Sequence, residues 1–306
     1  MGAYPNTIID LIRMDVSIII VNYNTKDLTN QCIKSVISNT VGLSYEIILV
    51  DNGSDDGSKE FFECSNEIVY IYSDRNLGFG KANNLGFTKA SGKYIFLLNS
   101  DTILLNNAIK IFFDYMEHAM MNIACCGCFL RNSKNEIIHS YGRFHTFWNS
   151  ISEWCFQHYL WHFGIDLHKY DYPINKTNNC EVEYITGAAV FLRKDVADKY
   201  GLFDPDFFMY SEDVEMAKRY SIHNNKSILL EAPRIVHLVG SSNKNSIYIK
   251  HIMGIRSLFL YEKKYMGKLE YSLYIWIFKF LYCLCFAVRN ISLKIKIQHI
   301  KAVVKL

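Results

Sequence analysis

The chain has 306 residues, 50% of them hydrophobic, and its 33 Lys and Arg against 30 Asp and Glu give a net charge of +3. Such apolar content at so small a net charge excludes a disordered chain, and the near balance of charge excludes a strongly basic nucleic-acid binder. The length suits one large domain or two modest ones, and a mean hydropathy of +0.02 suggests a soluble body with one apolar segment.

The N-terminus and the cysteines indicate the compartment. Residues 1–15 carry three charged side chains and no long apolar run, so no signal peptide is expected there. Cys125, Cys126 and Cys128 lie close together, but no second pair follows at the spacing of zinc ligands. We therefore expect the nine cysteines to be mostly small buried hydrophobic side chains in a reducing cytoplasm.

Four apolar runs alternate with amphipathic segments over the first hundred residues. Strands are predicted over 16–21, 46–50, 68–72 and 93–98, and helices over 25–39, 55–62 and 81–90. This alternation predicts an α/β fold with a central, mostly parallel sheet and helices on both faces.

Polar side chains follow each of the four predicted strands. Because ligands bind beyond the carboxyl ends of such strands, these residues predict a binding site at that edge of the sheet. A carboxylate at Asp51 can accept the imide N–H of a uracil or thymine ring, or it can cap the next helix. The polar residues at the four strand ends are Asn22, Tyr23 and Asn24; Asp51; Asn76; and Asn99, Ser100 and Asp101.

The stretch NLGFGKANN over residues 76–84 precedes the third predicted helix. Glycines there would let the backbone approach a phosphate at a helix N-terminus. The run nearly matches a dinucleotide fingerprint, so a nicotinamide-dependent oxidoreductase is one alternative. Asn83 stands where the third glycine is required, and the first strand–helix turn has no glycine, which counts against that alternative.

Further candidate residues lie in the second half of the chain. Glu212 and Asp213 precede a helix predicted over 214–220 and can act as a general base or as helix-capping acids. On that helix Glu215 and Arg219 are spaced to form an ion pair. His237, which is followed by Gly-Ser-Ser over 240–242, is either a metal ligand or a structural histidine.

The ordered motifs resemble those of family 2 glycosyltransferases with the GT-A fold. More narrowly, they are similar to the bacterial rhamnosyltransferase-like branch that builds surface polysaccharides. The resemblance covers residues 16–260, and its motifs are VSIIIVNYN, ILVDNGSDDGS, NLGFGKANNLGF, LLNSDT, TGAAVFLRKD, FDPDFFMYSEDVEMAKR and VHLVGSS.

The resemblance implies an inverting, metal-dependent transferase. Asp213 would be the general base, oriented with the acceptor by Glu212, and Asp101 with His237 would hold Mg²⁺ or Mn²⁺ on the donor diphosphate. Lys81 would lie near that diphosphate, although an ordinary solvated lysine remains the alternative. The residues implied to bind the nucleotide-sugar are Asn22, Tyr23, Asn24, Asp51, Asn76, Gly78, Lys81, Asn83, Asn99 and Ser100.

The substrates are also implied by resemblance. The donor would be dTDP-rhamnose, with UDP-hexoses as the alternative, and the acceptor a lipid-linked oligosaccharide of O-antigen- or capsule-like synthesis. A non-catalytic nucleotide-sugar-binding protein is a further alternative. Residues 140–180 are expected to form an irregular insertion near the site. The histidines expected at the surface or in the acceptor pocket are His139, His145, His158, His162 and His168.

The C-terminal part suggests a membrane address. Residues 271–288 are almost wholly apolar around Lys279, at the short limit for a span. Residues 289–306 hold five basic side chains and no acid, which favours an anionic leaflet. A helix buried against the catalytic body is the alternative, and spanning or lying on the membrane stays open.

These observations predict a division of the chain. Residues 1–260 would form the GT-A catalytic domain, with a nucleotide-binding half over 15–102 and an acceptor half over 103–260. Residues 261–306 would form membrane-associating helices at the cytoplasmic face of the bacterial inner membrane, as a peripheral or monotopic enzyme.

Overall fold

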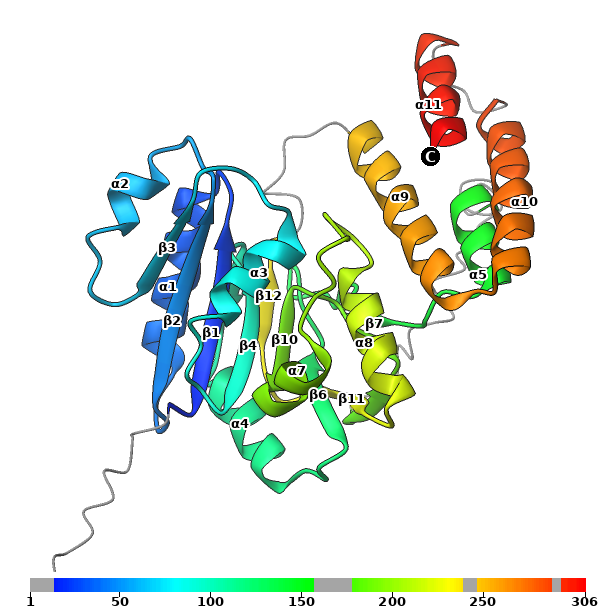
Figure 1. The fold of residues 1–306 in the computed structure, drawn as a ribbon. Coiled ribbons are helices and arrows are strands. Elements are labelled where there is room, and N and C mark those ends of the chain that lie inside the picture. The colour runs from blue at the N-terminus through cyan, green and yellow to red at the C-terminus, as the bar shows by residue number, and fades with distance from the viewer. Residues whose placement is uncertain (1–13, 157–177, 239–246, 288–292) are drawn as a thin grey trace, which may run out of the picture.

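A computed structural model describes residues 14–156, 178–238, 247–287 and 293–306 (Figure 1). Several sequence predictions lie outside the described residues. They concern most of the N-terminal segment, the Gly-Ser-Ser motif over 240–242, much of the insertion, and His158, His162 and His168.

An eight-stranded sheet forms the centre of the molecule. Strands β1 to β4 are mutually parallel, as predicted, whereas β10 runs antiparallel to both β4 and β6, and β8 is an antiparallel edge strand. The prediction of a mostly parallel sheet is therefore confirmed, with antiparallel strands added by the second half. The strands in sheet order are β3 (Val69–Ser73), β2 (Tyr45–Asn52), β1 (Val16–Asn22), β4 (Tyr94–Asn99), β10 (Ala189–Arg193), β6 (Ile123–Cys128), β11 (Lys226–Leu230) and β8 (Cys180–Val182).

Two apolar layers cover the two faces of this sheet. Because side chains alternate along a strand, Ile18 and Ile20 of β1 enter one layer and Ile19 enters the other. The first layer contains α1 (Lys26–Asn39), α2 (Ser58–Phe62) and α4 (Ala108–His118). The second contains α3 (Phe79–Phe87), α7 (Lys194–Tyr200) and α8 (Glu212–Ile222).

The early helices differ from their predicted bounds at the ends. Helix α2 begins at Ser58 because Gly57 takes a left-handed φ of +79° before it and the Asp56 carboxylate accepts the Ser58 N–H. Helix α3 begins at Phe79, two residues before the predicted start. Local turn chemistry, which hydrophobic spacing does not report, sets these ends.

Two short ladders lie outside the main sheet. Strand β5 (Thr102–Leu104) pairs with β12 (Ile235–His237), and β7 (Tyr141–Gly142) pairs with β9 (Tyr184–Ile185). The first ladder opposes Thr102 to His237, and so brings the segment after β4 beside residues 235–237.

The remaining helices build a separate apolar cluster. They are α5 (Phe147–Ile151), a π-helix (Ser152–Phe156), α9 (Ile247–Tyr265), α10 (Lys268–Ala287) and α11 (Leu293–Lys305). In Figure 1, α9 lies between the sheet domain and α10. The predicted boundary between residues 260 and 261 falls inside α9, so that helix continues from one part into the other.

The cysteines behave as expected from the sequence. Six of the nine are buried, and Cys64 alone is exposed. Burial raises the pKa of the Cys125 and Cys128 thiols to about 12, which keeps them neutral.

Candidate active site

The ends of β1 and β2 hold a fully buried carboxylate, that of Asp51. Asn22 lies opposite it in register and donates through Nδ2 to Oδ1 of Asp51 at 3.4 Å. The hydroxyl of Tyr70 donates to Oδ2 at 2.8 Å, and this hydrogen bond together with burial raises the pKa of Tyr70. Asp51 does not cap a helix, because α2 begins seven residues later at Ser58. That alternative was wrong.

Hydrogen bonds connect the residues that follow β1 to those that follow β2. The hydroxyl of Ser54 accepts from Asn22 Nδ2 at 3.1 Å and from the backbone N–H of Asn24 at 3.0 Å. Asn24 takes a left-handed φ of +56°, and Tyr23 beside it is exposed. Tyr23 therefore lies just after the end of β1 with its side chain accessible to a ligand.

The NLGFG stretch is clamped onto the second half of the chain. Gly78 has a φ of +86°, and a Cβ there would collide with the carbonyl oxygen of Phe208. That same oxygen accepts the backbone N–H of Phe79 at 2.9 Å. Asn76 accepts the Gly78 N–H at 2.8 Å, which holds the turn. The glycine is thus required for close approach between the two halves.

Two predicted donor-binding residues of α3 take different positions. Asn83 is buried inside the helix and donates to the Phe79 carbonyl at 3.0 Å, so it supports the first turn. Lys81 is exposed and lines a cavity that faces α9. Contact of either side chain with a nucleotide-sugar stays a prediction.

The end of β4 meets β12 in a buried polar cluster. Asp101 is 4% exposed, and its Oδ1 lies 3.1 Å from Nε2 of His237. Asp101 also accepts the backbone N–H of Leu238 at 2.9 Å through its carbonyl oxygen. The Ser100 hydroxyl lies 3.1 Å from the Thr25 hydroxyl, while the buried Oδ1 of Asn99 has no hydrogen-bond partner among the described residues. An unpartnered buried oxygen at this edge is suited to a bound ligand.

These residues fit a divalent cation of the kind the resemblance implies. Asp101 supplies an anionic oxygen and His237 an imidazole nitrogen, and both suit Mn²⁺, while Mg²⁺ prefers oxygen ligands. Within the described ranges no group of three His, Cys, Asp or Glu side chains comes together. The pair is therefore incomplete alone, and the remaining ligands would be diphosphate oxygens and water.

Helix α8 opens with an acidic pair, the buried Glu212 and the half-buried Asp213. Asp213 accepts the backbone N–H of Gly187 at 2.8 Å on Oδ2 and that of Val214 at 2.8 Å on Oδ1. Glu212 is 6% exposed, and within the described part of the chain its Oε2 has no hydrogen-bond partner. Tyr210 and Ser211, directly before the pair, both take left-handed φ values, of +72° and +59°. Two such non-glycine residues in a row mark a strained backbone, which is typical of functional sites.

Burial decides how this pair ionises. Desolvation raises the pKa of Glu212 to about 8, and the neighbouring charge of Asp213 adds to the rise. Desolvation also raises the pKa of Asp213, but the two backbone N–H groups oppose that rise. We therefore assign the shared proton to Glu212 and the negative charge to Asp213, which is the charge state that a base requires.

A pH dependence of stability follows from Glu212. An unfolded glutamate titrates near 4.5, so between that pH and about 8 the folded protein binds the extra proton and its free energy of unfolding falls as pH rises. Glu212→Gln is expected to reduce this fall, giving a variant that gains stability relative to wild type from pH 5 to pH 9. Urea unfolding at both pH values measures it, and Glu60→Gln on exposed α2 is the control. An equally steep fall in both variants would contradict the assignment.

The predicted ion pair between Glu215 and Arg219 is present at 2.9 Å. It belongs to a larger cluster around the buried Glu215, because Lys264 of α9 lies 2.5 Å from Oε1 of Glu215 and the Tyr265 hydroxyl donates to that oxygen at 3.0 Å. Lys264 also contacts Asp204 at 2.6 Å. The helix that carries Glu212 and Asp213 is therefore fixed to the C-terminal helices.

Some residues of the site had no role in the sequence analysis. Gly187 holds Asp213, and a Cβ on it would lie 3.2 Å from the Phe79 ring, so a small residue is required. Its only sequence signal was its place in the motif TGAAVFLRKD. Of the predicted surface or acceptor-pocket histidines that the structure describes, His139 is exposed and His145 is half-buried, and desolvation lowers the pKa of His145 to about 4.

Comparison with known proteins gives a consistent result. The sequence profile of glycosyl transferase family 2 matches residues 17–201. An uncharacterized glycosyltransferase of Rickettsia bellii is 36% identical over 105 residues, covering 33% of this chain and 15% of that protein. Glycosyltransferase GlyG of Streptococcus pneumoniae is 30% identical over 106 residues, covering 33% and 35%. A cholesterol galactosyltransferase of Borreliella burgdorferi is 28% identical over 37% of this chain and 32% of its own. The matches thus span between about a seventh and a third of these relatives' own lengths.

Solved structures share the fold. A crystal structure of GalNAc-T7 with UDP, GalNAc and Mn²⁺ aligns with a TM-score of 0.59 at 14% identity, over 97% of this chain and 57% of that one. Residues 1–349 of TarS from S. aureus align with a TM-score of 0.54 at 15% identity, over 94% and 79%.

Proposed function

The chain belongs to glycosyl transferase family 2, and on that premise we propose that it transfers a sugar, with inversion, from a nucleotide-sugar to an acceptor hydroxyl. The observation that carries the proposal is the half-buried carboxylate of Asp213, which accepts two backbone N–H groups beside the buried Glu212. Because the chain belongs to this family, the alternative of a nicotinamide-dependent oxidoreductase is set aside.

The reaction follows from this arrangement. Asp213 takes the proton of the acceptor hydroxyl while that oxygen attacks the anomeric carbon. The bond from the anomeric carbon to the diphosphate oxygen breaks, and the nucleoside diphosphate leaves with the electron pair. Glu212 keeps its proton and can donate a hydrogen bond through the oxygen that has no partner among the residues the structure describes.

The strand ends provide the donor site in this proposal. Asp51 binds the base, and Asn99 binds the ribose through its unpartnered oxygen. Asp101 and His237 hold Mg²⁺ or Mn²⁺, which when bound neutralises charge on the leaving diphosphate. The Mn²⁺ in the GalNAc-T7 crystal structure supports this assignment by analogy of fold.

The donor we propose is dTDP-rhamnose, with UDP-hexoses as the second candidate, on the strength of the motif resemblance. The test is a donor screen that follows release of free nucleoside diphosphate across UDP-, dTDP- and GDP-sugars. Acceptor-dependent release with one donor class supports the proposal. Binding of donors without any release would favour the non-catalytic alternative.

The acceptor we propose is a lipid-linked glycan at the cytoplasmic face of a bacterial inner membrane, in surface polysaccharide synthesis. Helix α10 supports a membrane location because it buries one face in the helical cluster and exposes another apolar face. We call this exposed set the α10 stripe. It consists of Leu269, Leu273, Trp276, Phe280 and Leu284.

The surroundings of α10 favour a helix that lies on the membrane. By length and composition α10 could cross a membrane, and 28% of its apolar window is buried. Its central Lys279 donates to the carbonyl of Val304 at 3.0 Å, at the C-terminal end of α11. Helix α10 therefore packs one side against protein, and its lysine is hydrogen-bonded to a neighbouring helix. The α10 stripe is the surface that this helix can bring into contact with lipid.

Membrane binding should depend on the α10 stripe. Trp276→Glu with Phe280→Glu is expected to lower binding to vesicles containing phosphatidylglycerol by more than about tenfold, because two large aromatic side chains lose burial in lipid. Co-sedimentation with vesicles measures it. The matched control is Met120→Glu with Met121→Glu, since these side chains are as exposed as Phe280, at 69%. An equal loss of vesicle binding in both double variants would refute the role of the α10 stripe in membrane binding.

A further inference from the structure

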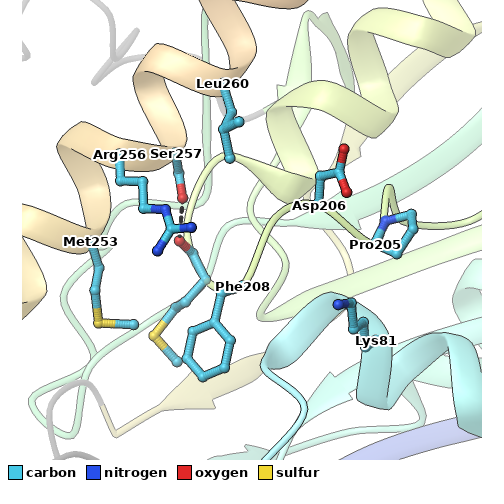
Figure 2. A pocket seen from close by; sticks show the side chains of 9 residues that line it. Lys81, Pro205, Asp206, Phe208, Met253, Arg256, Ser257 and Leu260 are labelled. Atoms are coloured by element: carbon cyan, nitrogen blue, oxygen red, sulfur yellow. Dashed lines mark hydrogen bonds between the residues drawn. The ribbon is translucent and has the colours of Figure 1, made fainter. Parts of the chain in front are cut away.

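A cavity of about 340 Å³ opens between the sheet domain and the C-terminal helices (Figure 2). Three separate elements form its walls. Lys81 comes from α3, and residues 205–209 come from the loop before α8. Four side chains of α9 complete the lining: Met253, Arg256, Ser257 and Leu260.

The lining combines positive charge with apolar surface. Arg256 and Lys81 come from different walls, and among the described residues neither forms an ion pair, while Asp206 is the one acid of the lining. In Figure 2 the α9 side chains lie on one side and Lys81 on the other, with Phe208 between them. Besides Phe208, the apolar surface comes from Met209, Met253 and Leu260. Such a lining suits an anionic group attached to a hydrocarbon chain.

The cavity is coupled to the proposed base through direct contacts. Phe208 lines the cavity, and its carbonyl accepts the N–H of Phe79. The Phe79 ring lies against Gly187, whose N–H holds Asp213. On the other side the Ser257 hydroxyl donates to the Met209 carbonyl at 2.7 Å, which fixes the loop that leads into α8.

Helix α9 also connects the cavity to the α10 stripe. Its lining residues recur at helical spacing on one face, from Met253 to Leu260. On its other face Ile255, Leu258 and Phe259 are buried in the cluster that contains α10. A ligand in the cavity is thus one helix away from the element that we place on the membrane.

We propose that this cavity binds the phosphate-bearing end of an amphipathic acceptor. Arg256 and Lys81 bind the phosphate oxygens, and Met253, Leu260 and Phe208 cover the first part of the hydrocarbon chain. This inference rests on the proposed transferase function and adds to it the feature of the acceptor that is recognised, namely a phosphate ester on a lipid chain.

The test is calorimetric binding of four probes in the presence of saturating UDP, which occupies the donor site. The probes are farnesyl diphosphate, farnesol, inorganic diphosphate and dihexanoylphosphatidylglycerol. Farnesyl diphosphate is expected to bind at least about tenfold more tightly than the other three, because it alone joins a diphosphate to an isoprenoid chain. Arg256→Gln is expected to weaken that affinity by about tenfold to hundredfold through loss of charged hydrogen bonds.

Controls separate this cavity from other sites. Lys263→Gln removes one charge from an exposed position of the same helix and should leave farnesyl diphosphate binding unchanged. An equal loss in Lys263→Gln, an equal loss of UDP affinity in Arg256→Gln, or equally tight binding of the phospholipid would each overturn the assignment. Thermal unfolding confirms that the variants fold.

The donor screen tests the transferase function independently. If Arg256 binds farnesyl diphosphate but the protein turns over no nucleotide-sugar, the proposed function fails and the anion site remains. If nucleotide-sugar is turned over but Arg256 has no effect on farnesyl diphosphate binding, the cavity assignment fails.

Discussion

Replacing Asp213 by Asn is expected to lower kcat for sugar transfer by about 10²- to 10⁴-fold, because the variant has no group to take the acceptor proton. The change is isosteric, and the amide oxygen can still accept one of the two backbone N–H groups from Gly187 and Val214. The fold and the affinity for UDP should therefore be largely retained. Initial rates of nucleoside diphosphate release, with the donor that the screen identifies, provide the measurement.

Asp195 offers a closely matched control for this variant. It is the second residue of α7, as Asp213 is of α8, and its Oδ1 accepts the N–H of Val196 at 2.8 Å in the same way. Asp195→Asn removes the same charge from the same helix position and should leave kcat unchanged. Asp213→Asn with wild-type kcat would remove the base assignment.

Asp101→Asn is expected to lower kcat by about 100-fold to 1000-fold, because a cation at the diphosphate supplies several kcal/mol of charge stabilisation. The backbone hydrogen bond from Leu238 to Asp101 does not involve the side chain, so the local strand contact should survive. Titration with Mn²⁺ should show weaker metal binding in Asp101→Asn and also in His237→Ala. In the wild type, EDTA should abolish transfer and added Mn²⁺ should restore it.

The surface acid Asp114 provides the comparison for the metal site. It forms an ion pair with Lys110 on the solvent-facing side of α4, so Asp114→Asn should change neither Mn²⁺ affinity nor kcat. Transfer that continues at the wild-type rate in EDTA would show that Asp101 and His237 do not hold a required cation.

The strands and helices of residues 15–102 could be predicted well because the pattern that indicates each of them lies within a short stretch of sequence. Runs such as 16–21 and 46–50 are long, β-branched and flanked by polar turns, and the alternation with helices leaves one sheet topology. Because parallel strands end at one edge, Asn22, Asp51 and Asn99 could be placed together before any coordinates.

The contacts between the two halves could not be predicted in the same way. Phe208 and Gly187 act through their backbone groups. The hydrogen bond from the Phe79 N–H to the Phe208 carbonyl does not affect the spacing of hydrophobic residues, so it could not be detected in the sequence. The same holds for Arg256, to which the sequence analysis gave no role. Its position in the cavity depends on how α9 packs against a loop that is distant in sequence.

The short ladder between β5 and β12 also has a kinetic meaning. It joins Thr102 to His237 and closes a loop of more than a hundred residues, and contacts of such high sequence separation form late because loop closure must come first. A growing chain can therefore complete strands β1 to β4 well before Asp101 meets His237. The fold thereby delays assembly of the proposed cation site until the chain has been synthesised past residue 237.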